Sequence, residues 1–158
     1  MGRLAVAVAL ALVVAGCDSR DVQKDLQITN VHTGWYDVGT TEAGLTKIVP
    51  SLSIDIKNVS ERDIASVQIN AVFRRVGENE AWGEHFIRAI DASGLKAGAE
   101  TMPIVMRSTL GYTGTESRIE LLGNKQFVDA KVQVFGKHGN RNWALMGEYP
   151  IDRQLLTE

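Results

Sequence analysis

Apolar and polar residues alternate in several short stretches of this chain, and this alternation limits the folds open to it. Residues 50–57 place polar side chains at one parity and apolar side chains at the other, namely Leu52, Ile54 and Ile56. A period of two puts the two kinds of residue on opposite faces of a β-strand. The same pattern recurs over residues 67–74 and 128–134. Each of these stretches therefore predicts a half-buried strand.

Turn residues separate further strand-like stretches, which lie at 26–37, 82–90, 101–107 and 143–151. The stretch 82–90 alternates poorly, as an edge strand does, and 137–141 predicts a hairpin tip. One short helix is expected at Glu116–Leu122, in a crossover that begins with the loop Gly111–Thr115. About seven short strands with little helical periodicity predict an all-β protein, an immunoglobulin-like β-sandwich.

The first seventeen residues have the features of an export signal. Arg3 precedes an unbroken apolar run, residues 4–15, and the run leads to Cys17, the one cysteine of the chain. An apolar run of about a dozen residues suits the h-region of a signal peptide and is too short to span a bilayer. The small residues before Cys17 resemble the lipobox of a bacterial lipoprotein, which implies cleavage before Cys17 and a diacylglycerol on its sulfur.

This resemblance divides the chain into a signal peptide at 1–16, a lipidated cysteine and tether at 17–25, and a sandwich domain at 26–158. Asp18 resembles the inner-membrane retention signal of enterobacteria, so a periplasm-facing inner-membrane protein is favoured. Three alternatives remain: a secretory signal cut near Ala15, an uncleaved membrane anchor and a buried N-terminal segment.

The charge of the mature chain bears on its partners. The full chain has a formal charge of −2, and loss of Arg3 with the signal makes it −3. No basic stripe is present to neutralise phosphates, so a nucleic-acid partner is not expected.

Part of the chain resembles a known family. A strand, the turn Asn58–Ser60, a strand through Phe73 and the loop Leu95–Gly98 before another strand resemble the FxLYD-like immunoglobulin-fold domains of exported prokaryotic proteins. The resemblance covers residues 49–106. The phenylalanine–x–leucine–tyrosine–aspartate element that names the family is absent. It implies a fold and an exported setting, and no catalytic residues.

The residues that carry chemistry do not form a recognisable set. His32, His85 and His138 lie more than fifty residues apart, without the spacing of metal ligands. The chain has neither a nucleophile elbow nor a phosphate-binding loop motif. We therefore expect no catalytic residue, no metal and no cofactor, and we interpret the chain as a non-enzyme.

Aromatic residues are the candidate binding groups. Phe135 has the opposite parity to Val132 and Val134, and alternation alone turns it outward. Trp35, Trp82 and Phe86 lie on predicted strands where burial in the core and exposure are both open. If exposed, these four residues are candidates for partner binding, because aromatic side chains are favoured interface anchors.

Two functions follow from these features. The first is a non-enzymatic binding or assembly module, anchored in the membrane by lipid and binding another envelope protein. The second is a receptor for a small ligand or glycan that stacks on Trp35, Trp82 or Trp143. An enzyme of an unrecognised kind would need a concave site with clustered polar groups.

Overall fold

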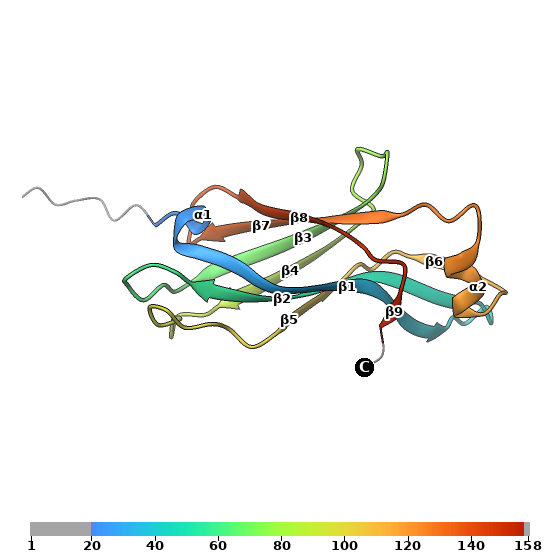
Figure 1. The fold of residues 1–158 in the computed structure, drawn as a ribbon, viewed down its shortest axis with the longest axis horizontal. Helices are drawn as coiled ribbons and strands as arrows, with labels where there is room; N and C mark the ends of the chain where they lie inside the picture. The colour runs from blue at the N-terminus through green and yellow to red at the C-terminus, as the bar shows by residue number, and fades with distance from the viewer. Residues whose placement is uncertain (1–19, 157–158) are drawn as a thin grey trace, which may run out of the picture.

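Two β-sheets pack face to face in the computed structural model, which describes residues 20–156. The first sheet has the strand order β5-β2-β1-β9, with β6 also paired to β2, and the second has the order β4-β3-β7-β8. Figure 1 shows the two layers side on, with α1 at one end of the long axis and α2 and β6 at the other. The predicted all-β sandwich is confirmed.

Residues 20–156 form nine strands and two short helices. In chain order they are α1 (Val22–Asp25), β1 (Leu26–Thr40), β2 (Thr46–Asn58), β3 (Val67–Arg75), β4 (Gly83–Ile90), β5 (Ile104–Arg107), β6 (Tyr112–Gly114), α2 (Arg118–Gly123), β7 (Ala130–His138), β8 (Ala144–Pro150) and β9 (Leu155–Leu156). Seven of the strands correspond to the seven predicted stretches, and β6 and β9 are additional.

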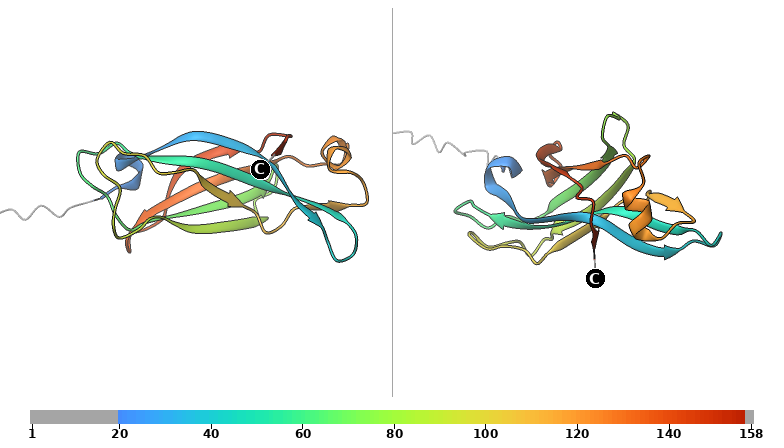
Figure 2. Two further views of the ribbon diagram at one scale, coloured as in Figure 1. Left: turned by 90° about the horizontal axis from the view of Figure 1, so that it is seen from below. Right: turned by 45° about the vertical axis from the view of Figure 1, so that its right-hand side comes forward.

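The alternating stretches form the core, as predicted. The apolar residues of β2, β3 and β7 that share the inward parity are almost completely buried, namely Leu52, Ile54, Ile56, Val67, Ile69, Ala71, Phe73, Ala130, Val132 and Val134. They come from both sheets and pack in one cluster between the layers. Figure 2 (left) looks from below, with β1, β2 and β5 of the first sheet in front of the strands of the second. Val128 precedes β7 and is exposed.

Two bulges shape the long hairpin of β1 and β2. Between Thr29 and His32 the first strand advances one residue more than its partner, and Asn30 adopts a φ of 49° there. A second shift lies between Asp37 and Gly39, where Gly39 has a φ of 97°. An extra residue in one strand bends it and increases its twist, so β1 curves over the core along its length.

Part of the segment predicted as a tether, residues 17–25, is folded as the helix α1. Asp21 caps α1 by accepting a hydrogen bond from the Gln23 N–H at 3.0 Å, and Val22 is 4% exposed. Residues 22–25 of the predicted tether are therefore packed on the sandwich, because Val22 buries its side chain in the core. Cys17 and the predicted signal peptide lie outside the described residues.

The crossover after β5 contains both a strand and a helix. Tyr112–Gly114 pairs with β2 as β6, in the stretch predicted as a loop. Ser117 and Glu120 form a reciprocal capping box at the start of α2, which agrees with the predicted helix to within about two residues.

The C-terminal strand packs onto β1 at a glycine. β9 pairs with β1 in parallel, next to Trp35 and Tyr36. A Cβ at Gly34 would come within 2.7 Å of the Leu156 side chain. Close approach of Leu156 to the sheet thus requires a residue without a side chain at position 34.

No helix within residues 20–156 has the length and apolar character needed to cross a membrane.

Candidate functional site

The four aromatic residues predicted as binding groups fall into two separate places. Trp35 is 0% exposed and Trp82 is half-buried, and both belong to a cluster inside one end of the sandwich. Phe86 is 57% exposed and Phe135 is partly exposed, on the outer face of the second sheet. The sequence left burial and exposure open for Trp35, Trp82 and Phe86, and the structure buries the first, half-buries the second and exposes the third.

The buried cluster joins Trp35 and Trp82 to two further aromatic rings. The ring centroid of Trp35 lies 4.7 Å from that of Phe127 in an edge-to-face arrangement, and 5.6 Å from that of Tyr112. Trp82 lies 5.0 Å from Tyr112, and the Arg75 guanidinium lies 5.6 Å from the Trp82 ring centroid. Edge-to-face and tilted contacts of this kind stabilise a core beyond the area that they bury. Trp35 is therefore a core residue and is withdrawn as a partner-binding candidate.

Strand register brings apolar side chains into one row across the outer face of the second sheet. Phe86 of β4 is opposite Asn70 of β3, Asn70 is opposite Phe135 of β7, and Phe135 is opposite Leu145 of β8. Asn70 has the opposite parity to the buried residues Ile69 and Ala71, so the whole row that is in register with it faces away from the core. The outward orientation predicted for Phe135 is confirmed.

Trp143 lies over the same face and extends the row. It precedes β8, yet its ring centroid lies 6.1 Å from that of Phe86 on the opposite edge strand, at an interplanar angle of 82°. Trp143 is 41% exposed and Leu145 is 44% exposed. We call Phe86, Phe135, Trp143 and Leu145 the aromatic strip.

Charged and polar groups lie beside the aromatic strip and within it, and Asn70 stands between Phe86 and Phe135. The Lys137 ammonium lies 4.9 Å from the Trp143 ring centroid, a distance at which it interacts with the ring face. The Asn70 side chain donates a hydrogen bond to Glu84 at 3.3 Å, and its own carbonyl oxygen is buried without a partner. Exposed aromatic side chains mixed with polar groups are common in protein-binding surfaces.

Sequence reasoning did not assign Leu145 to this surface. The hairpin tip at 137–141 indicated that residues 143–151 pair with β7. A register shift between Val134 and Phe135, however, determines which residue lies opposite Phe135. Hairpin periodicity alone cannot locate such a bulge, and so the fourth member of the strip was missed.

The histidines lie apart from the aromatic strip, and so do the carboxyl groups whose pKa is shifted. His85 contacts the backbone of Arg107 on the inner side of β4, and His138 is at the end of β7. Among the described residues, no three histidine, cysteine or acidic side chains come together as metal ligands.

Hydrogen bonds lower the pKa of three carboxyl groups, all of them in loops or at a helix start. The pKa of Asp63 is lowered by hydrogen bonds from Lys96 and the Ala97 N–H, that of Asp91 by Ser93, and that of Glu120 by Ser117. Asp91 and Glu120 order their own turns, and Asp63 joins its loop to the loop of Lys96 and Ala97, so structural contacts explain all three shifts.

Comparison with known proteins leaves the family open. No family model matches the chain, and no curated protein matches it. One solved structure, described as the X-ray structure of Northeast Structural Genomics Consortium target SoR45, is similar with a TM-score of 0.42 and 10% sequence identity. The match covers 83% of this chain and 89% of that chain. The description of the surface therefore depends on the geometry of this chain alone.

Proposed function

We propose that this chain is a lipid-anchored protein of the bacterial cell envelope that binds another envelope protein through the aromatic strip. The observation that carries the proposal is the exposed row of Phe86, Phe135, Trp143 and Leu145 on one sheet face. Water-exposed aromatic side chains gain free energy when a partner covers them, and a few such residues supply most of the affinity of an interface.

The lipid anchor is the second part of the proposal and depends on Cys17. A diacylglycerol on its sulfur, with a further acyl chain on the new amino terminus, would provide the two or more chains that stable membrane attachment requires. Arg20, the first described residue, is three residues after Cys17 and two before α1, which lies at one end of the long axis (Figure 1). The aromatic strip lies on the outer face of the second sheet, so an anchored domain would leave it open to a neighbouring protein.

The strand order supports an immunoglobulin-like assignment for the domain. The first three strands of the order β5-β2-β1-β9 correspond to strands E, B and A of that fold, and β4-β3-β7-β8 corresponds to C′, C, F and G. Domains of this architecture serve many binding functions, and so the site, and not the fold, carries the functional argument.

The binding proposal is tested by covalent crosslinking in the living cell followed by purification of the protein. Phe86→Ser removes the most exposed aromatic side chain of the strip, and Ile119→Ser is the matched control, because Ile119 is 74% exposed on α2 at the far end. We expect Phe86→Ser to reduce the yield of a specific crosslinked envelope protein by about tenfold, since interface anchors contribute about 1–2 kcal/mol or more. Equal yields from the two variants would refute the assignment of the strip.

The anchor is tested separately by intact-mass measurement. We expect a mature chain that begins at Cys17 and carries acyl chains, and a Cys17→Ala variant that is released from the membrane by a high-salt wash. A mass that corresponds to a free thiol would exclude the anchor and leave the crosslinking result unaffected.

A glycan is the second candidate ligand, and the exposed Trp143 ring is the observation that favours it. Sugar rings stack on an open aromatic face, but the Lys137 ammonium already lies over the Trp143 ring. Tryptophan fluorescence titrated with envelope glycans distinguishes the two functions. A change that persists in a Trp82→Phe variant and is lost in Trp143→Phe would support glycan binding.

A further inference from the structure

The first half of β1 has a neighbouring strand on one side only. Ile28 lies opposite Ile56 of β2, and the Ile56 N–H and C=O both bond to Thr101, at 3.0 and 2.9 Å, on the side of β2 away from β1. In an antiparallel pair of this kind, the backbone groups of the two residues point away from each other. The Ile28 N–H and C=O therefore point outward from the sheet edge, where no strand within residues 20–156 pairs with them.

Further along the same edge, the C-terminal segment of the chain adds a strand. The Trp35 N–H donates to the Gln154 carbonyl oxygen at 2.8 Å, and the Gln154 side-chain amide donates to the Thr33 carbonyl oxygen at 2.8 Å. β9 follows directly and pairs with β1 in parallel. In Figure 1 the segment from β8 to β9 crosses to β1 at this point. This edge of β1 thus accepts an added strand, and the stretch before it, residues 26–32, has none.

A groove between β1 and β8 accompanies the unpaired stretch. It consists of two pockets of about 330 and 220 Å³, and Tyr149 lines both of them. Ile28, Val31, Met146 and Tyr149 contribute partly buried apolar side chains that pack on the core. This β1–β8 groove is therefore apolar at its base, and β1 borders it with a free backbone donor and acceptor at Ile28.

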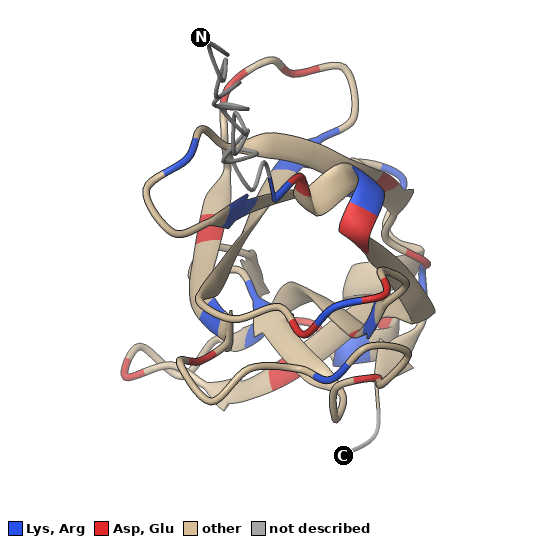
Figure 3. Ribbon diagram, turned by 90° about the vertical axis from the view of Figure 1, so that its left-hand side faces the viewer, with Lys and Arg blue, Asp and Glu red and all other residues tan. Residues whose placement is uncertain are grey.

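The β1–β8 groove has little charge. Among the described residues, its lining holds one acidic side chain, Asp152, and no lysine or arginine. Figure 3 looks onto the α1 end of the molecule and shows basic and acidic residues interspersed over its loops. Neither sign of charge predominates there, so we expect a ligand of the groove to be uncharged where it lies along β1.

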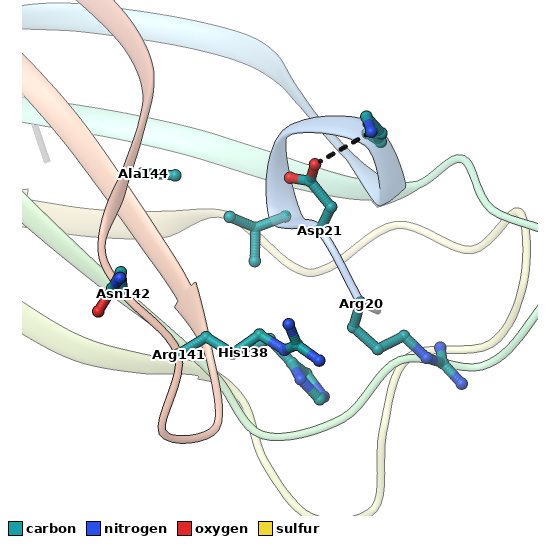
Figure 4. Close-up of a pocket in the computed structure, with 8 residues that line it drawn as sticks. Arg20, Asp21, His138, Arg141, Asn142 and Ala144 are labelled. Carbon is teal, nitrogen blue, oxygen red and sulfur yellow. Dashed lines mark ion pairs between the residues drawn. The ribbon is translucent and has the colours of Figure 1, made fainter. Parts of the chain in front are cut away.

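A separate pocket, between α1 and the turn that joins β7 to β8, is polar, but its charged groups already have partners. The Asp21 carboxylate lies 3.5 Å from the Lys24 ammonium, an ion pair drawn dashed in Figure 4. Arg20 donates a hydrogen bond to the Asp63 carbonyl oxygen at 2.6 Å, and Arg141 also has a partner. That pocket therefore supplies no free charge to a ligand that lies along β1.

We propose that the β1–β8 groove binds an extended, uncharged peptide segment of another protein, which adds a strand to the open edge of β1. The peptide backbone would bond to the Ile28 N–H and C=O. Its alternate side chains would be apolar and enter the groove over Met146 and Tyr149, because successive side chains of a strand point to opposite faces. In this mode the main-chain hydrogen bonds give affinity, and the pockets for alternate side chains give specificity.

This site is distinct from the aromatic strip. The strip lies on the outer face of the second sheet, whereas the groove follows the edge of the first sheet. Leu145 alone belongs to the strip and also lines the groove. Strand addition to β1 therefore does not depend on Phe86 or Phe135.

Hydrogen exchange of the purified full-length protein, resolved at single amides, tests this proposal. The probe is a short synthetic peptide of alternating valine and threonine with a lysine at each end for solubility. We expect a saturating concentration to slow exchange of the Ile28 amide about tenfold, because this N–H gains a hydrogen-bond partner. The same peptide with every amide methylated lacks donors and should leave the exchange unchanged.

Ile28→Pro removes the outward N–H and leaves the hydrogen bonds between β1 and β2 in place, so proline is compatible with this edge position. Binding of a labelled peptide, measured by fluorescence anisotropy, should weaken about tenfold. Ile28→Val is the matched control, because it keeps the N–H, and it should bind the peptide as the native chain does. Circular dichroism verifies that both variants fold, and if Ile28→Pro does not fold, the two peptides on the native chain decide alone.

Three outcomes would overturn the proposal. The first is unchanged exchange of the Ile28 amide at saturating peptide. The second is protection confined to the amides of β4, which would place the peptide on the edge of the second sheet. The third is loss of the Ile28 protection in Phe86→Ser, which would show that the aromatic strip holds the peptide. Protection that persists in Phe86→Ser would support the groove whether or not the strip binds an envelope protein.

Discussion

At the scale of single residues, Trp35 and Trp143 differ in the exposure of their side chains and in the roles that we assign to them. Trp35 is 0% exposed, and Trp143 is 41% exposed. Trp35 contacts Trp82, Tyr112 and Phe127 at once, and its indole N–H is buried without a hydrogen-bond partner. Its contribution to stability therefore comes from ring packing and apolar burial, and not from a polar contact.

We predict that Trp35→Ala lowers the free energy of unfolding by about 4 kcal/mol, because it opens a cavity among rings that cannot collapse to fill it. Urea denaturation followed by circular dichroism measures the change. Trp143→Ala is the control and should cost less than about 1.5 kcal/mol, since its ring is partly in water already. Similar losses in the two variants would contradict the assignment of Trp35 to the core.

At the scale of elements, one carboxylate ties two loops together. Asp63, in the loop between β2 and β3, lies 3.1 Å from the Lys96 ammonium and accepts the Ala97 N–H at 3.1 Å. Both partners lie in the loop between β4 and β5. Because these hydrogen bonds favour the ionised form, the pKa of Asp63 is lowered.

The lowered pKa gives this contact a defined pH dependence. The folded chain binds a proton at Asp63 less readily than the unfolded chain, so the contribution to stability is complete above the unfolded pKa and is lost as the pH falls through the folded pKa. We predict that Asp63→Asn lowers Tm at neutral pH, and that the difference from the native chain shrinks below about pH 4.

Thermal unfolding monitored by circular dichroism across this pH range measures the effect. Lys96→Gln removes the largest cause of the pKa shift and should reproduce part of it. A Tm difference for Asp63→Asn that stays constant from neutral to acidic pH would be inconsistent with this role.

The same scale shows which elements the sequence could predict. The alternating stretches around Leu52, Ile69 and Val132 became β2, β3 and β7, because a period of two with one apolar face leaves only one way to bury that face. The short strands β6 and β9 carry too few residues for a periodic signal. β6 depends on pairing with β2, and β9 depends on the space above Gly34.

The candidate site was predictable only in part. The parity of Phe135 relative to Val134 indicated an outward side chain, and β4 was expected at an edge. The contact between Trp143 and Phe86 crosses from one edge strand to the other, so no local pattern contains it. Trp35 and Tyr36 are neighbours on one strand, and only the position of the second sheet decides which of them is in the core.

At the scale of the whole molecule, the two sheets must be joined where their edge strands meet. β4 and β5 are edge strands of different sheets, and no ladder connects them. His85 of β4 fills this place: its Nδ1 lies 3.2 Å from the Arg107 backbone nitrogen, which donates to it, and 3.1 Å from the Arg107 carbonyl oxygen. The imidazole thus provides an acceptor for one backbone N–H of an otherwise open edge.

We predict that His85→Ala destabilises the fold by about 1–2 kcal/mol, because a part-buried backbone N–H loses its acceptor. Guanidinium chloride denaturation should show a lower midpoint with an unchanged m-value. His32→Ala is the control, since His32 is exposed on the outer face of the first sheet, and should change stability by less than about 0.5 kcal/mol. Equal effects would show that His85 does not close this edge.

Local alternation, turn residues and the apolar run before Cys17 are enough to predict a sandwich and an export signal, because each depends on residues a few positions apart. The burial of Trp35 and the aromatic strip depend on segments far apart in the chain. Trp35 is buried only when the elements of Trp82 and Phe127 pack against it, and the strip forms only when β4, β3, β7 and β8 are paired; long-range packing of that kind leaves no periodic trace among neighbouring residues.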